Sequence, residues 1–159
     1  SALSGTSSIF MVIIGTVLLA KMLALTGVPE VVTQWLVSMG AGQLGFILMV
    51  VVLYLILGCF LDSISILLLT MPIIMPIARA VGADLVWFGI ILVKLLEIGL
   101  VTPPVGLNVY VMKSALGSLI PLTTIFRGIA WFVVADMITL VLIIAFPMLT
   151  LILPQLLIK

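Results

Sequence analysis

The run from Gly99 to Asn108 combines a break in an apolar helix with oxygen atoms that could bind a hard cation. It reads Gly-Leu-Val-Thr-Pro-Pro-Val-Gly-Leu-Asn. Because proline has no N–H, Pro103 and Pro104 leave two backbone carbonyls without their helical donors. The Thr102 hydroxyl and the Asn108 amide add further polar groups. Such backbone is tolerated at membrane depth only where it is buried or lines a watery cavity, as in transporter ion sites. The run therefore indicates a transport site rather than an enzyme active site.

A second polar cluster, residues 58–65, interrupts the stretch from Leu44 to Ala78, which contains no Lys or Arg. A single helix of that length would exceed the thickness of the hydrocarbon layer, so the chain must turn at the cluster. The stretch forms either two full spans joined by an exposed loop or a re-entrant helical hairpin whose tip stops inside the membrane. We favour the hairpin, over residues 44–79, because Asp62 with Ser63 and Ser65 suits a buried ion-binding tip.

The composition is that of an integral membrane protein. Of 159 residues, 65% are hydrophobic and 7% are charged, and the mean hydropathy is +1.62. The net charge of +1 gives no electrostatic basis for binding nucleic acid. With no histidine and one cysteine, the chain lacks the residues for disulfides, zinc sites or histidine-based acid–base chemistry. Because the chain shows neither an initiator Met nor a signal peptide, we expect a fragment or a processed start.

Apolar runs and their interruptions predict one all-α membrane domain over residues 1–159. Asp84 is a candidate N-cap, and the positive-inside rule places the connector, flanked by Lys113 and Arg127, in the cytoplasm and the C-terminus outside. Besides the hairpin, the expected elements are a span over 9–26, an interfacial helix or ordinary connector over 28–40, a broken span over 85–116, a connector over 118–127 and a last span over 129–153.

The remaining polar and aromatic residues have structural interpretations. Lys94 and Glu97 lie three apart on one helical face and can neutralise each other or pair with neighbouring helices. Asp136 can form a similar pair or contact another subunit. Asp62, Glu97 and Asp136 form no recurring catalytic motif, so we expect neither an enzyme nor an organic cofactor. Cys59 is interpreted as a small packing residue, and the three Trp residues as lipid-facing packing and interface anchors.

Several motifs resemble the large membrane subunit of TRAP transporters, the DctM-like permeases. The resemblance extends over about residues 9–157 and corresponds to the C-terminal half of such a subunit. It rests on Gly58-Cys59-Phe60-Leu61-Asp62, Met71-Pro72-Ile73 with Pro76, Phe88-Gly89-Ile90-Ile91, the run from Ile98 to Asn108, and Ile125-Phe126-Arg127-Gly128.

The resemblance implies an elevator-type ion-transporter fold, of which this chain supplies one repeat with a re-entrant hairpin and a broken helix. It implies sodium-coupled symport of C4-dicarboxylates or related organic acids across the bacterial inner membrane. The implied partners are a periplasmic binding protein, a small membrane subunit and the N-terminal half of the large subunit. The implied sodium-binding residues are Gly58, Asp62, Ser63, Ser65, Gly99, Thr102, Pro103 and Gly106, and the implied substrate-binding residues are Ser63 and Asn108.

Two other functions remain open at this stage. The chain could belong to a divalent-anion/sodium symporter that needs no binding protein, or it could be a membrane scaffold subunit that transports nothing. A further expectation applies to either transporter: the hairpin tip and the broken helix meet near the midplane, with Asp62 and Ser63 close to Thr102–Asn108. A cation there would offset the charge of an anionic substrate in a low-dielectric cavity.

Overall fold

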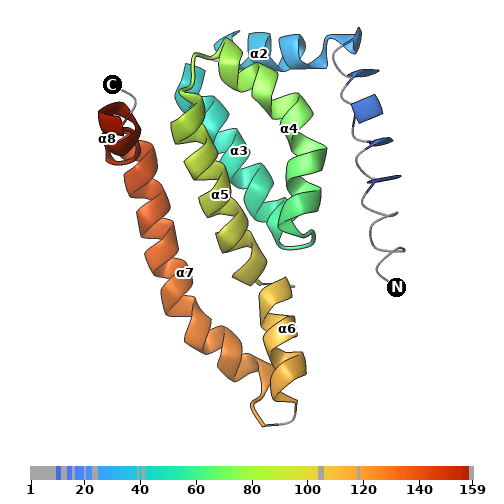
Figure 1. Ribbon diagram of the computed structural model, residues 1–159, viewed down its shortest axis with the longest axis vertical. Coiled ribbons are helices and arrows are strands. Elements are labelled where there is room, and N and C mark those ends of the chain that lie inside the picture. Colours follow the sequence, from blue (N-terminus) through green and yellow to red (C-terminus); the bar gives the residue numbers. More distant parts are fainter. Residues whose placement is uncertain are drawn as a thin grey trace. The chain divides into compact units, whose positions relative to one another are not determined.

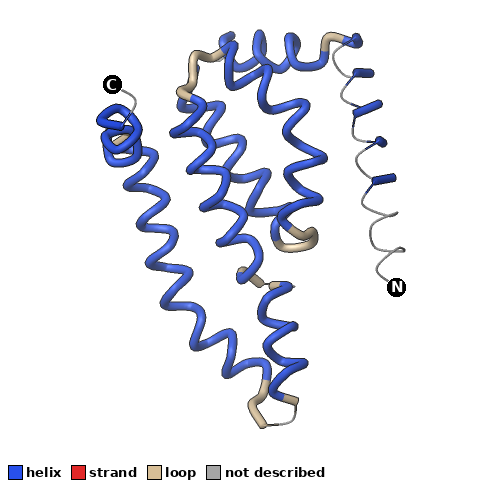
Figure 2. Tube along the Cα trace, viewed as in Figure 1, coloured by secondary structure: helices blue, strands red, loops and turns tan. Residues whose placement is uncertain are grey.

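The computed structural model describes residues 10–11, 14–15, 17–19, 21–22, 25–38, 40, 42–103, 106–117 and 119–157. Within these residues every regular element is a helix, which confirms the all-helical prediction for the part described (Figure 2). The expected span over 9–26 lies partly outside them, and its described positions are helical. The helices labelled in Figure 1 are α2 (Val28–Ser38), α3 (Gly42–Gly58), α4 (Ser63–Ala80), α5 (Leu85–Val101), α6 (Leu107–Leu116), α7 (Leu122–Ala145) and α8 (Met148–Leu157).

Among the described residues, two helices, α4 and α7, are long and apolar enough to cross a membrane. α7 has 24 residues and contains Arg127 and Asp136, whereas α3 has no charged residue but is shorter, with 17 residues. A span needs about 20 apolar residues to cross the hydrocarbon layer. The helices therefore agree with the membrane class that the composition indicates.

The chain divides into two compact units. The first comprises the chain up to Leu48 together with Ile64–Ala83, and the second comprises Met49–Ser63 together with the chain from Asp84 on. In the first unit, α2 and α4 line a pocket of about 210 Å³ that includes Glu30 and Pro76. α4 stays helical through its two prolines and buries one face, formed by Ile66, Thr70, Ile74, Ile77 and Ala78.

In the second unit, α5 is the central helix and packs against α6, α7 and α8. Figure 1 shows α6 following α5 beyond a break, with α7 running back along both helices. The Asp84 carboxylate accepts hydrogen bonds from the backbone N–H groups of Val86 (2.9 Å) and Trp87 (3.0 Å), which confirms the predicted N-cap. Because α5 packs against three other helices, eight of its 17 residues are buried, namely Trp87, Phe88, Ile91, Leu92, Leu95, Leu96, Ile98 and Gly99.

A proline divides the last helical region, and a tryptophan of α5 supplies the hydrogen-bond donor that this proline lacks. Pro147 has no N–H to give to the carbonyl of Ile143, so α7 ends at Ala145 and α8 begins at Met148, within the expected span over 129–153. The indole N–H of Trp87 donates to that carbonyl instead, at 2.7 Å. Trp87 is 4% exposed, so the prediction that every Trp faces lipid or the interface is wrong for this residue.

The turn between α6 and α7 is held by one lysine. The Lys113 ammonium donates to the carbonyl of Gly117 (2.5 Å) and to that of Ile120 (2.7 Å). Pro121 then forms the N-cap of α7, with an extended backbone (φ −68°, ψ 146°) and no side-chain capping bond. The expected connector over 118–127 is consequently helical from Leu122 on.

Candidate functional site

The broken helix begins where α5 ends, at Val101. Thr102 is extended, with φ −81° and ψ 135°, and its backbone N–H donates to the carbonyl of Gly99 at 3.2 Å. This bond replaces the one that Pro103 cannot make, so the Gly99 carbonyl regains a donor. The Thr102 hydroxyl donates to the carbonyl of Ile98 at 2.5 Å. A hydroxyl oxygen that donates its hydrogen still offers lone pairs to a cation.

The break ends at Gly106, which starts α6. Gly106 has φ +58°, and a Cβ atom there would lie 3.3 Å from the Phe126 ring, the Val101 carbonyl oxygen and a Val109 methyl group. Both the left-handed backbone and the crowding favour glycine. Asn108 lies in the first turn of α6 and is exposed. Pro104 and Val105, the other predicted residues of the break, lie outside the described residues.

The turn after α3 is in direct contact with the end of α5. A Cβ atom on Gly58 would lie 2.7 Å from Gly99 Cα, and a Cβ atom on Gly99 would lie 2.7 Å from Gly58 Cα. The two backbones therefore touch where neither residue has a side chain. The next residue, Cys59, is 8% exposed, and its thiol contacts the carbonyls of Leu55 (3.1 Å) and Pro103 (3.3 Å). The turn and the break thus form one polar junction.

The electrostatics of this junction favour a cation. Gly58 ends α3 and Gly99 lies in the last turn of α5, so the carboxyl ends of two helices meet. The carboxyl end of a helix carries about half a negative charge. Within the part of the chain described, His, Cys, Asp and Glu nowhere form a group of three that could hold a metal ion. A cation bound at the junction would therefore rely mainly on backbone carbonyls and hydroxyl oxygens.

The predicted site residues fall at different places. Gly58, Gly99, Thr102, Pro103 and Gly106 belong to the junction or the adjoining break, in the second unit. Asp62, in the same unit, is exposed and precedes α4, and Ser63 is the first residue of that helix. Their approach to Thr102–Asn108 stays a prediction. Ser65 belongs to the first unit.

One functional candidate was missed from the sequence, namely the Cys59 thiol. It was interpreted as packing only, yet it joins the turn to the Pro103 carbonyl across 44 positions of sequence. Its place next to Gly58 and the polar cluster was the one signal that could have indicated this contact.

A charged group joins α5 to α7 farther from the break. The Lys94 ammonium lies 2.6 Å from the Asp136 carboxylate and 3.3 Å from the Glu97 carboxylate. The predicted Lys94–Glu97 pair is present, and the shorter contact is the one to the neighbouring helix.

The chain is similar to proteins of one transport family over almost its whole length. The family model described as "Tripartite ATP-independent periplasmic transporter, DctM component" matches residues 1–149. The sialic acid TRAP transporter large permease protein SiaM of Vibrio cholerae is 34% identical over 151 residues, which cover 95% of this chain and 35% of SiaM. The C4-dicarboxylate TRAP transporter large permease protein DctM of Pseudomonas aeruginosa is also 34% identical, over 94% of this chain and 35% of that protein.

A third relative names another kind of cargo. The isethionate TRAP transporter permease protein DctMQ of Oleidesulfovibrio alaskensis is 35% identical over 112 residues, 70% of this chain and 18% of DctMQ. The chain spans 35% of the length of SiaM and of the Pseudomonas DctM, rather than the half that the resemblance predicts.

Proposed function

Since the chain belongs to the DctM family of tripartite ATP-independent periplasmic transporters, we propose that it forms part of the transport pathway of a sodium-coupled organic-acid permease. The permease is a multi-pass protein of the bacterial inner membrane. It works with a periplasmic binding protein, a small membrane subunit and the rest of the large subunit. The cargoes named for the relatives, which are sialic acid, C4-dicarboxylates and isethionate, are all organic acids and support this class of substrate.

The observation that carries the proposal is the junction of Gly58 and Cys59 with Gly99 and Pro103. Two polar interruptions, far apart in sequence, lie against each other inside an otherwise apolar chain. Transporters bind their ions where helices are interrupted and backbone carbonyls become available.

Sodium is the ion that this chemistry suits, because the junction presents mainly carbonyl and hydroxyl oxygen atoms. A carboxylate substrate would in turn be favoured at the amino end of α6, near Asn108, where N–H groups lack helical acceptors. The attraction between the cation and the anion would then offset part of the free-energy cost of placing each charge in a low-dielectric cavity. This arrangement couples the binding of one to the binding of the other.

The family match favours this function over the two alternatives. The matching family model describes a component of a tripartite transporter, so a system with a binding protein is preferred to a symporter that works without one. A scaffold subunit that transports nothing would have no need for a junction rich in carbonyls at the break.

The test is the double substitution Pro103→Ala with Pro104→Ala in the intact transporter. Alanine restores both N–H groups, so the helix can close over the carbonyls that we assign to sodium. We expect the sodium concentration for half-maximal uptake into proteoliposomes to rise about tenfold, the equivalent of about 1.4 kcal/mol. Pro154→Ala removes a helix proline from α8 and is the matched control. An unchanged sodium dependence in the double variant would refute the site.

A second variant tests the hairpin residue. Asp62→Asn should impair sodium-driven uptake more strongly than it impairs membrane insertion or thermal stability, because asparagine keeps the size of the side chain at this exposed position but removes its charge. Equal losses of uptake and stability would indicate a structural role for this carboxylate.

A further inference from the structure

A groove between α5 and α7 combines apolar walls with charge. It has a volume of about 420 Å³ and is lined by Val86, Gly89, Ile90 and Val93 of α5 and by Ile143 of α7, together with Lys94 and Glu97. We call it the α5–α7 groove. It lies wholly within the second unit, and its residue Glu97 is two positions before Gly99 of the junction.

The charges at the α5–α7 groove do not balance. Lys94 is a single cation that contacts two carboxylates, those of Asp136 and Glu97. The Lys94 and Asp136 side chains are 20% and 31% exposed, whereas that of Glu97 is 61% exposed and its contact with Lys94 is the longer one. The group of Lys94, Asp136 and Glu97 carries a formal net charge of −1. Glu97 is its most exposed member.

This charge lies next to α7, which is long and apolar enough to cross a membrane. Asp136 lies within α7, the more hydrophobic of the two candidate spans, and Lys94 holds Glu97 to the same group. An ionised side chain facing lipid is costly, so intramembrane charges pair or face protein. Lipid tails can fill the apolar part of the groove, but they offer nothing to oppose the Glu97 carboxylate.

We propose that the α5–α7 groove is the docking surface for a transmembrane helix of the same permease polypeptide, one that carries an arginine or lysine facing Glu97. The inference rests on the proposed function, because it takes the chain as part of a family-length permease. The chain covers 35% of SiaM and of the Pseudomonas DctM, so most of such a permease is available to supply the helix. A basic residue opposite Glu97 makes the group electrically neutral, while the apolar walls receive the rest of the helix.

Photo-crosslinking in the intact permease tests the proposal without any transport measurement. A benzoylphenylalanine probe replaces Val93, which is 57% exposed in the groove, and a probe at Val86 serves as the second position if the first variant does not fold. We expect the captured peptide to come from the same polypeptide and to contain Lys or Arg within one helical turn of the crosslink. The matched control replaces Ile138, which is also 57% exposed but lies on α7 outside the groove. It should not capture that peptide.

Charge reversal then tests the role of Glu97. Glu97→Arg should reduce the crosslink from position 93 by about tenfold, a change of about 1.4 kcal/mol in docking. Changing the captured Lys or Arg to Glu in the same molecule should restore it. The proposal is overturned if the probe captures only lipid, a separate subunit or a helix without a basic residue, or if charge reversal leaves the yield unchanged. Because sodium dependence plays no part in these readouts, they can fail while the proposed function stands, and the reverse also holds.

Discussion

Gly99→Ala should destabilise the permease even though alanine is the better helix former. The Cβ atom would lie 2.7 Å from Gly58 Cα and 3.2 Å from the Gly58 carbonyl carbon. Carbon atoms prefer separations of about 3.5–4.0 Å, so the first contact is too short by about 1 Å. Both opposing atoms belong to backbone, and no side-chain rotation can relieve the overlap. The carboxyl ends of α3 and α5 must therefore move apart.

The magnitude follows from two opposing effects. Overpacking of a well-packed contact costs about 1–3 kcal/mol, and we place this contact in the upper part of that range because backbone has to move. The change from glycine to alanine within a helix stabilises the folded protein by about 1 kcal/mol, because alanine has the higher helix propensity. The expected net loss in the free energy of unfolding is therefore about 1–2 kcal/mol.

Gly128→Ala in α7 is the matched control. A Cβ atom on Gly128 meets nothing within 4 Å, and Gly128 does not line the α5–α7 groove, so only the gain in helix propensity remains. We expect this variant to be stabilised by about 1 kcal/mol, the opposite sign to Gly99→Ala. Denaturant titration of the detergent-solubilised permease measures both values. A version in which Cys59 is the sole cysteine gives a second readout, because separation of α3 from α5 exposes its thiol to labelling reagents.

Two results would refute this reasoning. If Gly99→Ala stabilises the protein as much as Gly128→Ala does, the two backbones are not in contact. If Gly99→Ala destabilises the protein but leaves Cys59 as slow to react as in the parent, the strain is not at the junction. A Gly58→Ala, Gly99→Ala double variant should cost less than the two single losses combined, because the first alanine already separates the helices.

Two further predictions concern the contacts between α5 and α7. Trp87→Phe keeps an aromatic ring but removes the donor to the Ile143 carbonyl, so it should lower the free energy of unfolding by about 1–3 kcal/mol, whereas Trp131→Phe at a 79% exposed position should have little effect. Equal effects at the two tryptophans would contradict the role given to the indole N–H. Asp136→Asn should destabilise the protein more than Glu97→Gln does, because Asp136 is the closer and less exposed partner of Lys94. Denaturant titration of both variants decides the order, and the reverse order would show that Glu97 is the principal partner.

The helix ends were the most predictable part of the fold. A proline ends a helix locally, because it lacks the backbone N–H that the helix needs. Pro103 and Pro104 therefore predict a break from the sequence alone, and α5 does end at Val101. The Asp84 cap was predictable for the same reason, since a side chain and the N–H groups it caps are sequence neighbours.

Contacts between residues far apart in the sequence were harder to predict. The pattern of polar residues directed attention to Asp62 and Ser63, whereas the contact found is between Gly58 and Gly99, where the absence of a side chain is what matters. A glycine in a sequence does not reveal which backbone approaches it. Trp87 was likewise misread, because its partner is a carbonyl made available by a proline 60 positions downstream, and aromatic character alone does not distinguish that role from a membrane anchor.

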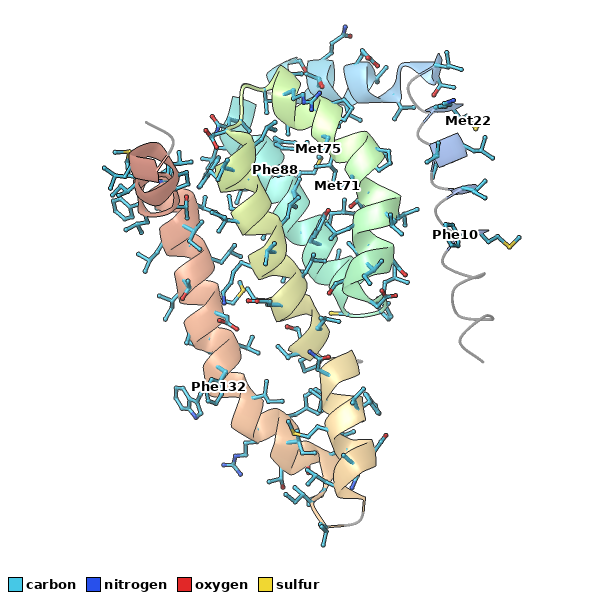
Figure 3. The ribbon with its side chains drawn as sticks, viewed as in Figure 1. Phe10, Met22, Met71, Met75, Phe88 and Phe132 are labelled. Carbon is cyan, nitrogen blue, oxygen red and sulfur yellow. The ribbon has the colours of Figure 1, made fainter. Side chains whose placement is uncertain are left out.

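Two aromatic side chains of α7 are exposed, in contrast to the buried Trp87. Trp131 is 79% exposed, and Phe132, labelled in Figure 3, is 73% exposed. The exposure of Trp131 agrees with the predicted lipid-facing or interfacial role, whereas the burial of Trp87 does not. The difference between Trp131 and Trp87 is burial, which depends on tertiary packing and was not available from composition.

The lysine that holds the α6–α7 turn has a practical consequence for protein engineering. A short polar turn between two helices is the usual choice for inserting an epitope tag or a fluorescent reporter. Here the Lys113 ammonium limits the length of the turn, because it donates hydrogen bonds to the carbonyls of both Gly117 and Ile120. Added residues would separate those acceptors and free α7 to start in a new direction. A tag at this turn would therefore report on an altered transporter.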